Sequence, residues 1–311
     1  MILITGGLGY LGGRIAEHLI KSGYQVRIGT SRSNVEIPFS LKSCEIVFTD
    51  LTNEDSLFQA CKNITSVIHL ASIDSHGCEN DPELALLVNG LGTLKLLKAV
   101  SKSGVAKFLY FSTIHVYGNT LCGEIDELSL PRPLHPYSIT HRLAEDYVME
   151  ASDSKKISGT VFRLSNAFGY PVGKVNTCWN LVVNDFCKQA VDLKHIILNS
   201  NGTQHRNFLP ISDVSHAVKY WIENPNEKFC EEIFNLGGET FTVFDIASRV
   251  AERCRIIFGW SIRIDRHDLS DVSYIQEPLN YNQEKIFSIG CKLRTDINSE
   301  IDMLLKFLNR N

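Results

Sequence analysis

Short apolar runs recur along the first half of the chain, and segments of helix length separate most of them. The segment at residues 82–102 carries leucine and valine at spacings of three and four, the period of an amphipathic helix. Nearly continuous apolar strands that alternate with helices are typical of a parallel sheet covered on both faces, so we expect a doubly wound α/β fold. The strand-like runs lie at residues 2–4, 26–28, 45–48, 67–70, 108–111 and 159–163, and the other helix-length segments at 12–22 and 53–62.

The alternation becomes less regular after Ser165, where glycine, proline and asparagine interrupt the apolar pattern. We therefore expect a first domain over residues 1–165 and a smaller lobe over residues 166–311. Strand-like runs at both ends of residues 208–236 predict that these segments return to the first sheet, so that the two parts are partly interleaved. An amphipathic pattern over residues 300–308 predicts a closing helix.

Composition narrows the class of protein. The chain has 311 residues, of which 44% are hydrophobic and 21% charged, enough for a large core. Its net charge is -4 without a long run of either sign, which argues against binding nucleic acid or an anionic membrane through bulk charge. No apolar run approaches the ~18 residues of a membrane-spanning helix. No basic flank or cleavage site precedes the first apolar run, so we expect a cytoplasmic protein.

The nine cysteines are scattered, and no pair of them has the C-x-x-C spacing of zinc and redox sites. An odd number of such cysteines indicates reduced, mostly buried thiols. We expect no metal site.

A glycine-rich loop from Thr5 to Gly12 follows the first strand directly and opens the first helix. Glycines allow a tight turn and a close approach of the backbone, and the helix N-terminus offers free N–H groups and a partial positive charge to a pyrophosphate. Between a strand and a helix this pattern predicts a dinucleotide site of the Rossmann type, and an ordinary glycine turn is the weaker interpretation. The residues expected at the cofactor are Gly6, Gly9, Tyr10, Leu11 and Gly12.

Residues at the ends of the second and third strands are expected to contact the dinucleotide, and those after the second strand bear on whether it is NAD or NADP. NAD enzymes usually place an acid on the ribose 2′-hydroxyl there, but residues 28–33 read IGTSRS. Arg32 would offer its guanidinium to a 2′-phosphate, so we expect NADP in preference to NAD; the alternative is a solvated loop arginine. Asp50 and Leu51 are placed to contact the adenine, and Asp50 could also cap the next helix.

Further motifs follow in order, and together they carry a family resemblance. With the glycine loop and Asp50, they make the chain up to about Asp245 similar to the extended short-chain dehydrogenase/reductase family, in its nucleotide-sugar epimerase, dehydratase and ketoreductase branch. The resemblance implies a Rossmann-like domain with Leu70 and Ala71 at the cofactor, and a nucleotide-diphosphate sugar as substrate. The motifs are HLAS at 69–72, VNGLGT at 88–93, FSTIHVYG at 111–118, YSITH at 137–141, RLSNAFG at 163–169 and NGTQHR at 201–206.

The resemblance places acid/base chemistry at Tyr137, on a sugar hydroxyl or ketone whose oxygen Thr113 would hydrogen-bond. A tyrosine with a pKa of about 10 is a poor base at pH 7 unless nearby positive charge lowers that pKa. In the family a lysine four residues later supplies this charge, and this chain has His141 there. We expect His141, mostly neutral at pH 7, to keep a reduced version of the lysine's role. The alternative is an uninvolved residue on the helix surface.

The two residues after Thr113 bear on the type of reaction. Dehydratases of the family carry an Asp-Glu pair there, and this chain has Ile114 and His115, which disfavours a 4,6-dehydratase. His115 is a candidate for an additional acid/base residue beside a ketone, or a histidine packed beneath the nicotinamide loop. Arg32 slightly favours a ketoreductase that consumes NADPH over a 4-epimerase, which usually retains NAD.

The resemblance also implies Asn166 and Arg206 at the diphosphate of the substrate. Arg206 could instead pair with Asp213 at the surface. Helices near residues 90 and 145 form a dimer in the family, so we expect a homodimer, although core packing is the safer interpretation for any one of their leucines. The rival function is a catalytically silent dinucleotide-binding regulator, in which the lost lysine marks abandoned chemistry.

Overall fold

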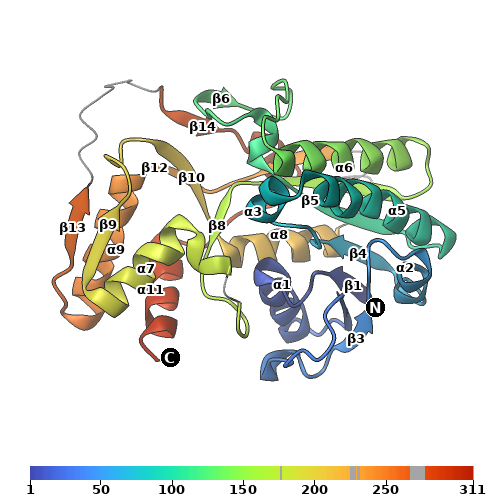
Figure 1. Cartoon of the computed structure of the whole chain (residues 1–311), viewed down its shortest axis with the longest axis horizontal. Helices are drawn as coiled ribbons and strands as arrows, with labels where there is room; N and C mark the ends of the chain where they lie inside the picture. The colour runs from blue at the N-terminus through green and yellow to red at the C-terminus, as the bar shows by residue number, and fades with distance from the viewer. Residues whose placement is uncertain (176, 225–228, 230–231, 267–276, 311) are drawn as a thin grey trace.

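A seven-stranded parallel sheet forms the centre of the first lobe in the computed structural model (Figure 1). The structure describes residues 1–175, 177–224, 229, 232–266 and 277–310. The strand order is β11-β7-β5-β4-β1-β2-β3, and every pairing is parallel, which confirms the predicted doubly wound α/β fold. The strands are β1 Ile2–Thr5, β2 Val26–Thr30, β3 Glu45–Phe48, β4 Ser66–His69, β5 Lys107–Thr113, β7 Ser158–Leu164 and β11 Glu232–Leu236.

The strand order reverses beside β1. The chain runs outward from β1 through β2 and β3, then returns to β4 on the other side of β1. Thr5 and His69, the last residues of β1 and β4, are register partners, so the loops that follow these strands lie next to each other. In open α/β sheets, ligands bind at such a switch point, outside the carboxyl ends of the strands.

Helices cover both faces of the sheet because its strands are apolar on both sides. One buried layer joins Ile2 and Ile4 to helices α1 and α8. The opposite layer joins Leu3 and Val67 to helices α2, α5 and α6. The helices are α1 Tyr10–Lys21, α2 Glu54–Ala60, α5 Gly92–Lys102, α6 Pro136–Asp153 and α8 Ile211–Glu223.

The helix predicted at residues 82–102 is continuous, although three segments compose it. They are α4 (Pro82–Ala85), the π-helical η2 (Leu86–Leu91) and α5. The expectation that no run could span a membrane is wrong for this helix, which is long and apolar enough by length and composition. Half of its apolar window is buried inside the fold, as in the core helix of a packed domain.

The second lobe contains a three-stranded sheet of order β12-β10-β8, packed against helices α7, α9 and α11. The expectation that residues 208–211 return to the large sheet is wrong, because β10 pairs with β8 and β12. The segment at the other end of residues 208–236 does join the large sheet, as β11 beside β7. The elements are β8 Asn166–Phe168, β10 His205–Pro210, β12 Glu239–Thr242, α7 Val182–Leu193, α9 Val243–Phe258 and α11 Ile297–Leu308.

Two smaller strand pairs interleave the lobes further. Strand β6 (Gly123–Ile125) pairs with β14 (Leu279–Tyr281), and β14 also contacts β10 and β12. The first half of the chain therefore contributes to the second lobe, while α8 from the second half covers the large sheet. The remaining elements are β9 His195–Leu198, which pairs with β13 Arg263–Arg266, and the short helices η1 Phe39–Leu41, α3 Ser75–Asn80, η3 Ile114–Tyr117, η4 Thr177–Asn180 and α10 Glu284–Ser288.

Candidate active site

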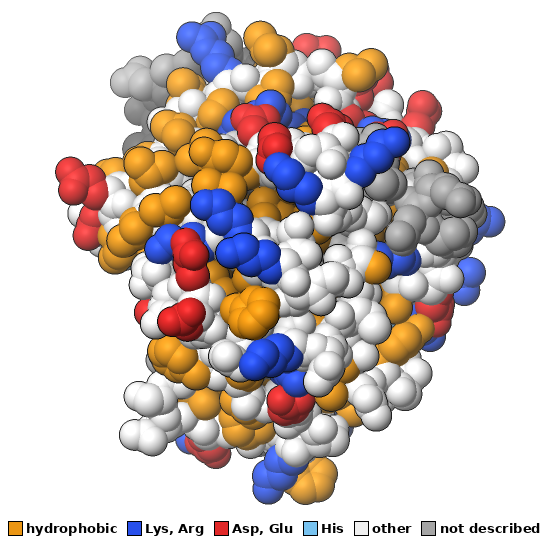
Figure 2. All heavy atoms as spheres, turned by 90° about the vertical axis from the view of Figure 1, so that its right-hand side faces the viewer, with side chains coloured by type: hydrophobic (Ala, Val, Ile, Leu, Met, Phe, Trp, Pro, Cys, Tyr) orange, Lys and Arg blue, Asp and Glu red, His pale blue; other side chains and the backbone are white. Residues whose placement is uncertain are grey.

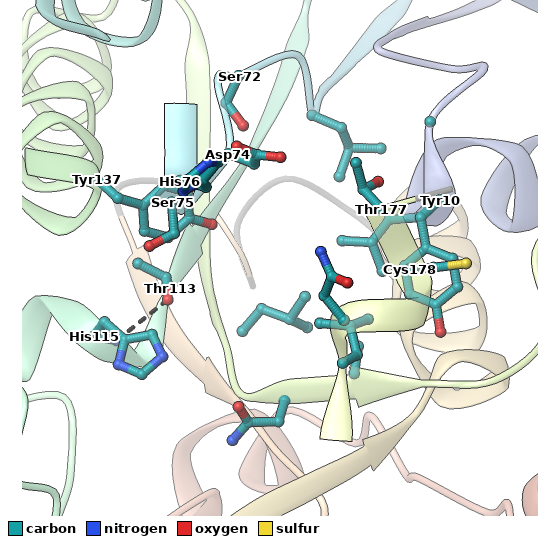
Figure 3. Close-up of a pocket in the computed structure, with 18 of the residues that line it drawn as sticks. Tyr10, Ser72, Asp74, Ser75, His76, Thr113, His115, Tyr137, Thr177 and Cys178 are labelled. Carbon is teal, nitrogen blue, oxygen red and sulfur yellow. Dashed lines mark hydrogen bonds between the residues drawn. The ribbon is translucent and has the colours of Figure 1, made fainter. Parts of the chain in front are cut away.

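A cavity of about 690 Å³ lies at the carboxyl ends of β1, β4 and β5, with the second lobe on its other side (Figure 3). The glycine loop, the segment after β4, the residues after β5 and the first turn of α6 form its wall on the first lobe. Residues of β8, η4 and the start of α7 close it from the second lobe. Its size and its place at the switch point are those of a site for small molecules.

The glycine loop approaches its neighbours so closely that side chains do not fit. Gly6 has a φ of +68°, and a Cβ there would lie 2.9 Å from the backbone nitrogen of Ala71. A Cβ on Gly12 would lie 2.3 Å from the carbonyl oxygen of Gly6. Gly9 caps α1 without a side-chain hydrogen bond, which leaves the first N–H groups of the helix for a ligand. Of the residues predicted at the cofactor, the cavity is lined by Gly6, Gly9, Tyr10, Leu11, Gly12 and Leu70.

The other residues expected at the cofactor lie outside the cavity lining. Ala71 contacts the glycine loop through its backbone, and Leu51 is buried. The carboxylate of Asp50 accepts hydrogen bonds from the hydroxyl and the N–H of Thr52, at 2.7 and 2.8 Å, and these lower the pKa of Asp50. Arg32 lies exposed beyond the end of β2, and its guanidinium forms no ion pair within the described part of the chain.

Thr113 and Tyr137 lie on the same side of the cavity, with His115 beyond Thr113 (Figure 3). Thr113 ends β5, and its hydroxyl oxygen accepts the backbone N–H of His115 at 3.2 Å. Tyr137 lies in the first turn of α6, where His135 caps the helix by accepting the N–H of Tyr137 at 3.1 Å through Nδ1. The hydroxyl of Tyr137 has no hydrogen-bond partner among the described residues, so it is available to a substrate.

The surroundings of Tyr137 keep its phenol protonated. Burial raises the pKa of Tyr137 to about 12, and the neighbouring Cys78 and Asp74 act in the same direction. A tyrosine with this pKa donates a proton at neutral pH far more readily than it accepts one.

His141 lies one turn after Tyr137, but its ring does not line the cavity. The residue is 3% exposed, and its Nδ1 lies 2.7 Å from the hydroxyl of Tyr110 on β5. The ring packs edge-on against that of Tyr137, with 4.3 Å between the centroids. Burial lowers the pKa of His141 to about 4. The interpretation as a surface residue is therefore wrong, whereas a reduced version of the lysine's role for this buried, neutral ring stays a prediction.

Buried polar contacts fix the helix that carries Tyr137. Glu145 of α6 and Arg163 of β7 form a bidentate ion pair, with N···O distances of 3.0 and 2.7 Å, and both side chains are almost fully buried. Arg163 also donates to the hydroxyl of Tyr117 at 2.8 Å. Asn89 donates to the hydroxyl of Thr140 on α6 at 3.2 Å. These contacts hold α6 against the sheet and so fix the position of its first turn.

Asn166 and Arg206, expected at the diphosphate, lie on the neighbouring strands β8 and β10. Asn166 lines both the main cavity and an adjoining recess of about 160 Å³, and Arg206 lines the recess. The Arg206 guanidinium has no ion pair among the described residues, and burial lowers its pKa. The alternative pairing with Asp213 is wrong, because Asp213 accepts the backbone N–H groups of Arg294 and Thr295, each at 3.0 Å.

The sequence analysis missed several polar residues that line the cavity. Asp74 and His76 follow β4 and lie on the same side of the cavity as Tyr137 (Figure 3). Their position in the sequence could have indicated them, because the segment after a central strand at a switch point faces the crevice. No sequence signal placed Thr177 and Cys178 opposite them, since only the packing of the second lobe does so. The other missed polar residues are Ser75, Asn119, His135, Ser138 and Asn180.

Helix α1 joins the glycine-loop side of the cavity directly to the second lobe. The hydroxyl of Tyr10 donates to the carbonyl of Gly169 at 2.9 Å. The guanidinium of Arg14 lies 3.7 Å from the ring centroid of Tyr170 and donates to the hydroxyl of Ser212 at 3.0 Å. These contacts tie the helix that begins at the glycine loop to the lobe expected to hold the substrate.

The cavity offers hydroxyl, imidazole and amide groups. Within the described ranges, no group of three or more His, Cys, Asp or Glu side chains could hold a metal ion. The described cysteines are all free thiols, and six of the eight are buried. The groups available for chemistry in this cavity are therefore hydroxyl and imidazole groups beside a glycine loop.

Comparison with known proteins gives one consistent family. A family model described as "NAD dependent epimerase/dehydratase family" matches residues 2–237. The "Putative UDP-glucose 4-epimerase" of Methanocaldococcus jannaschii is 27% identical and covers 100% of this chain and 99% of its own. The "dTDP-D-glucose 4,6-dehydratase" of Mus musculus is 25% identical and covers 100% and 89%. The crystal structure of a UDP-glucose 4-epimerase from Thermus thermophilus in complex with NAD shares the fold, with a TM-score of 0.80, 23% identity and coverage of 99% and 98%.

Proposed function

Because the chain belongs to the NAD dependent epimerase/dehydratase family, we propose that it transfers hydride between a nicotinamide dinucleotide and a carbinol or ketone of a nucleotide-diphosphate sugar. The observation that carries the proposal is the placement of Thr113 and Tyr137 in the same cavity as the glycine loop. An unbonded phenol and a hydroxyl on one wall are the groups that a carbonyl oxygen needs when its carbon receives hydride.

The residues present fit a dinucleotide. Gly6 and Gly12 allow a turn so tight that a Cβ at either position would collide with neighbouring backbone, and the start of α1 offers free N–H groups to a pyrophosphate. When bound, the dinucleotide supplies or accepts the hydride.

The state of Tyr137 favours reduction of a ketone. Its phenol donates a proton to the carbonyl oxygen as the carbonyl carbon receives hydride, so that the ketone becomes a carbinol and the phenolate remains to be reprotonated from solvent. Thr113 holds the same oxygen by a hydrogen bond. With its pKa raised to about 12 by burial, the phenol of Tyr137 is protonated at neutral pH, and this is the form that can donate to a ketone oxygen. His141 acts in this scheme as a positioning residue, since its neutral ring packs on the ring of Tyr137.

Arg32 supports NADPH as the reductant, with NADH as the alternative. Its free guanidinium lies beyond β2, where the sequence carries no acid to hold a ribose 2′-hydroxyl. A reaction that consumes and releases its cofactor fits NADPH. The free thiols fit the reducing cytoplasm, where such a cofactor is regenerated.

A 4-epimerase is the second candidate, because relatives named as epimerases cover the whole chain. The two functions differ in cofactor balance: a ketoreductase oxidises one NADPH for each product, whereas an epimerase regenerates its cofactor in every turnover. A 4,6-dehydratase is disfavoured, although relatives carry that name, because Ile114 and His115 replace the acid pair that elimination needs.

We also propose that the chain forms a homodimer through the helices near residues 90 and 145. Figure 2 shows the side of the molecule that carries α2 and α5, with hydrophobic side chains grouped among charged ones. Leu87→Glu should shift the mass seen by sedimentation toward the monomer, whereas Leu193→Glu, at the exposed end of α7, should not. Unchanged mass in the first variant would reject this interface. The exposed apolar residues of these helices are Leu84, Leu86, Leu87, Leu91 and Ile139.

The proposal is tested by mixing the protein with NADPH or NADH and a panel of nucleotide-linked ketosugars, and following nicotinamide absorbance and the sugar product. Oxidation matched by carbinol formation supports ketone reduction. Interconversion of sugars with catalytic cofactor supports the epimerase. Dinucleotide binding without turnover on any member of the panel supports the rival regulator.

A further inference from the structure

The part of the cavity wall that lies beyond Thr113, on the side of His115, carries hydrogen-bond donors, whereas the carboxylate of Asp74 lies on the Tyr137 side of Thr113 (Figure 3). His115, Asn119 and His135 line it, and the only acidic residue among the described lining residues, Asp74, comes from the segment after β4. The adjoining recess continues this wall through His115 and Asn119 to Arg206, and no described acidic residue lines it. This part of the site is therefore built for a group that accepts hydrogen bonds.

Two imidazoles on this wall have nitrogens free for a ligand. Nδ1 of His135 accepts the N–H of Tyr137, so a neutral ring carries its proton on Nε2 and can only donate there. Neither ring nitrogen of His115 is bonded to another described residue, and only its backbone N–H bonds to Thr113. Figure 3 shows the His115 ring beside Thr113 at the edge of the cavity.

We propose that the sugar bears a carboxylate on the ring carbon beside its reacting carbon. His115 and His135 bind this carboxylate, while Arg206 binds the diphosphate. This inference rests on the proposed function and names its substrate class, a nucleotide-linked uronic acid or its keto form. A carboxylate only accepts hydrogen bonds, which matches the donors on this wall. A neutral hydroxymethyl group also donates, and the described residues of this wall offer it no acidic acceptor.

Charge supports the same assignment. His115 lies near Arg206 and His135, and burial together with these neighbours lowers its pKa, so His115 is neutral beside one guanidinium. A bound carboxylate reverses that balance, because an anion within hydrogen-bond distance favours the imidazolium. The uronate then gains a charge-assisted hydrogen bond that a neutral sugar does not.

Calorimetric titration with a matched pair of ligands tests the inference. UDP-glucose and UDP-glucuronic acid differ only in a hydroxymethyl group and a carboxylate, and each is titrated into the protein saturated with NADP⁺. We expect the uronate to bind about tenfold more tightly, the effect of one hydrogen bond to a charged group. Equal affinities, or tighter binding of UDP-glucose, overturn the inference while leaving the proposed function standing. No binding of either sugar, nor of UDP or dTDP alone, overturns both.

Three variants locate the interaction. His115→Gln keeps a donor but loses the charge, so it should remove the preference for the uronate and leave the affinity for UDP-glucose unchanged. Arg206→Met should weaken both ligands by the same factor, because both carry the diphosphate. His76→Gln changes a lining histidine on the Tyr137 side of Thr113, away from His115, so it is the control and should preserve the preference. Loss of the preference in Arg206→Met but not in His115→Gln would overturn the assignment of the carboxylate to His115.

Discussion

The first lobe contributes two walls to the cavity, and the properties of one depend on backbone geometry while those of the other depend on side chains and their surroundings. The cofactor wall is made of backbone: Gly6 and Gly12 are required because a side chain would collide with atoms 2.9 and 2.3 Å from its Cβ. The acid/base wall is made of side chains, and their properties depend on what surrounds them. His141 stands where the family has lysine, yet Tyr110 and burial turn it into a neutral packing partner of Tyr137.

This difference shows which functions a motif can carry by itself. Backbone geometry follows from glycine positions, so the cofactor wall keeps its function as long as those glycines remain. The raised pKa of Tyr137 depends on burial, on Cys78 and on Asp74, and none of these lies in the tyrosine itself. We therefore expect that a chain can retain a dinucleotide-binding glycine loop while the protonation state of its acid/base wall changes.

The largest effect is expected from a side chain in the glycine loop. Gly12→Val should abolish dinucleotide binding, because its Cβ would lie 2.3 Å from the carbonyl of Gly6. Fluorescence titration with NADPH and NADH measures this. Gly104→Asn is the control, since nothing lies within 4 Å of the Cβ position of Gly104 and asparagine tolerates its positive φ of +69°. Normal binding by Gly12→Val would show that the dinucleotide lies elsewhere.

On the acid/base wall, Tyr137→Phe should lower the rate of hydride transfer by about 10²–10⁴-fold, the range of general acid catalysis. Dinucleotide affinity should change little, because the glycine loop is intact. Stopped-flow absorbance of NADPH with the best ketosugar measures the rate. The control is Tyr147→Phe, in the same helix but packed against the core between α6 and the sheet. Equal rates in the two variants would remove Tyr137 from the chemistry.

The pH dependence of the free energy of unfolding tests whether His141 is buried and neutral. The unfolded chain protonates this residue below about pH 6.5, whereas burial lowers its pKa in the folded chain to about 4. Stability is therefore lost as the pH falls through this window, by about 2 kcal/mol between pH 7 and pH 5. The free energy of unfolding is measured with urea at pH 7 and at pH 5. Between these two pH values, His141→Gln should lose about 2 kcal/mol less stability than the unaltered chain. The control is His76→Gln, at an exposed histidine, which should lose as much as the unaltered chain. An unchanged pH dependence in His141→Gln would contradict a neutral buried imidazole.

The smallest effect concerns the far end of the cofactor wall. Arg32→Ser should weaken NADPH binding by about tenfold, the effect of losing one hydrogen bond to a charged group, and leave NADH binding unchanged. Parallel titrations with both dinucleotides measure the ratio. Lys21→Ser, an exposed lysine at the end of α1, controls for the loss of one positive charge. An equal loss for both dinucleotides would exclude a contact to the 2′-phosphate.

The large sheet and its helices were predictable from the apolar pattern, because strands buried on both faces cannot be polar. The same pattern could not assign β10 and β11 to different sheets, since both segments look alike and only their partners differ. For the site, the glycine loop, Thr113 and Tyr137 came from motifs. Asp74 and His76 had a weak local signal, because they follow a central strand at the switch point. The pairing of Arg206 with Asp213 was wrong because Asp213 accepts hydrogen bonds from the distant backbone N–H groups of Arg294 and Thr295.

The sequence by itself determined where backbone must come close to a ligand and which side chains carry reactive groups, because glycine spacing and residue type are local properties. Only the tertiary structure decided that position 141 is buried against Tyr110, that burial keeps the phenol of Tyr137 protonated, and that imidazoles converge beside Thr113. The reason is that protonation and charge balance depend on neighbours brought together from distant parts of the chain, through burial and Coulomb interactions that no local pattern encodes.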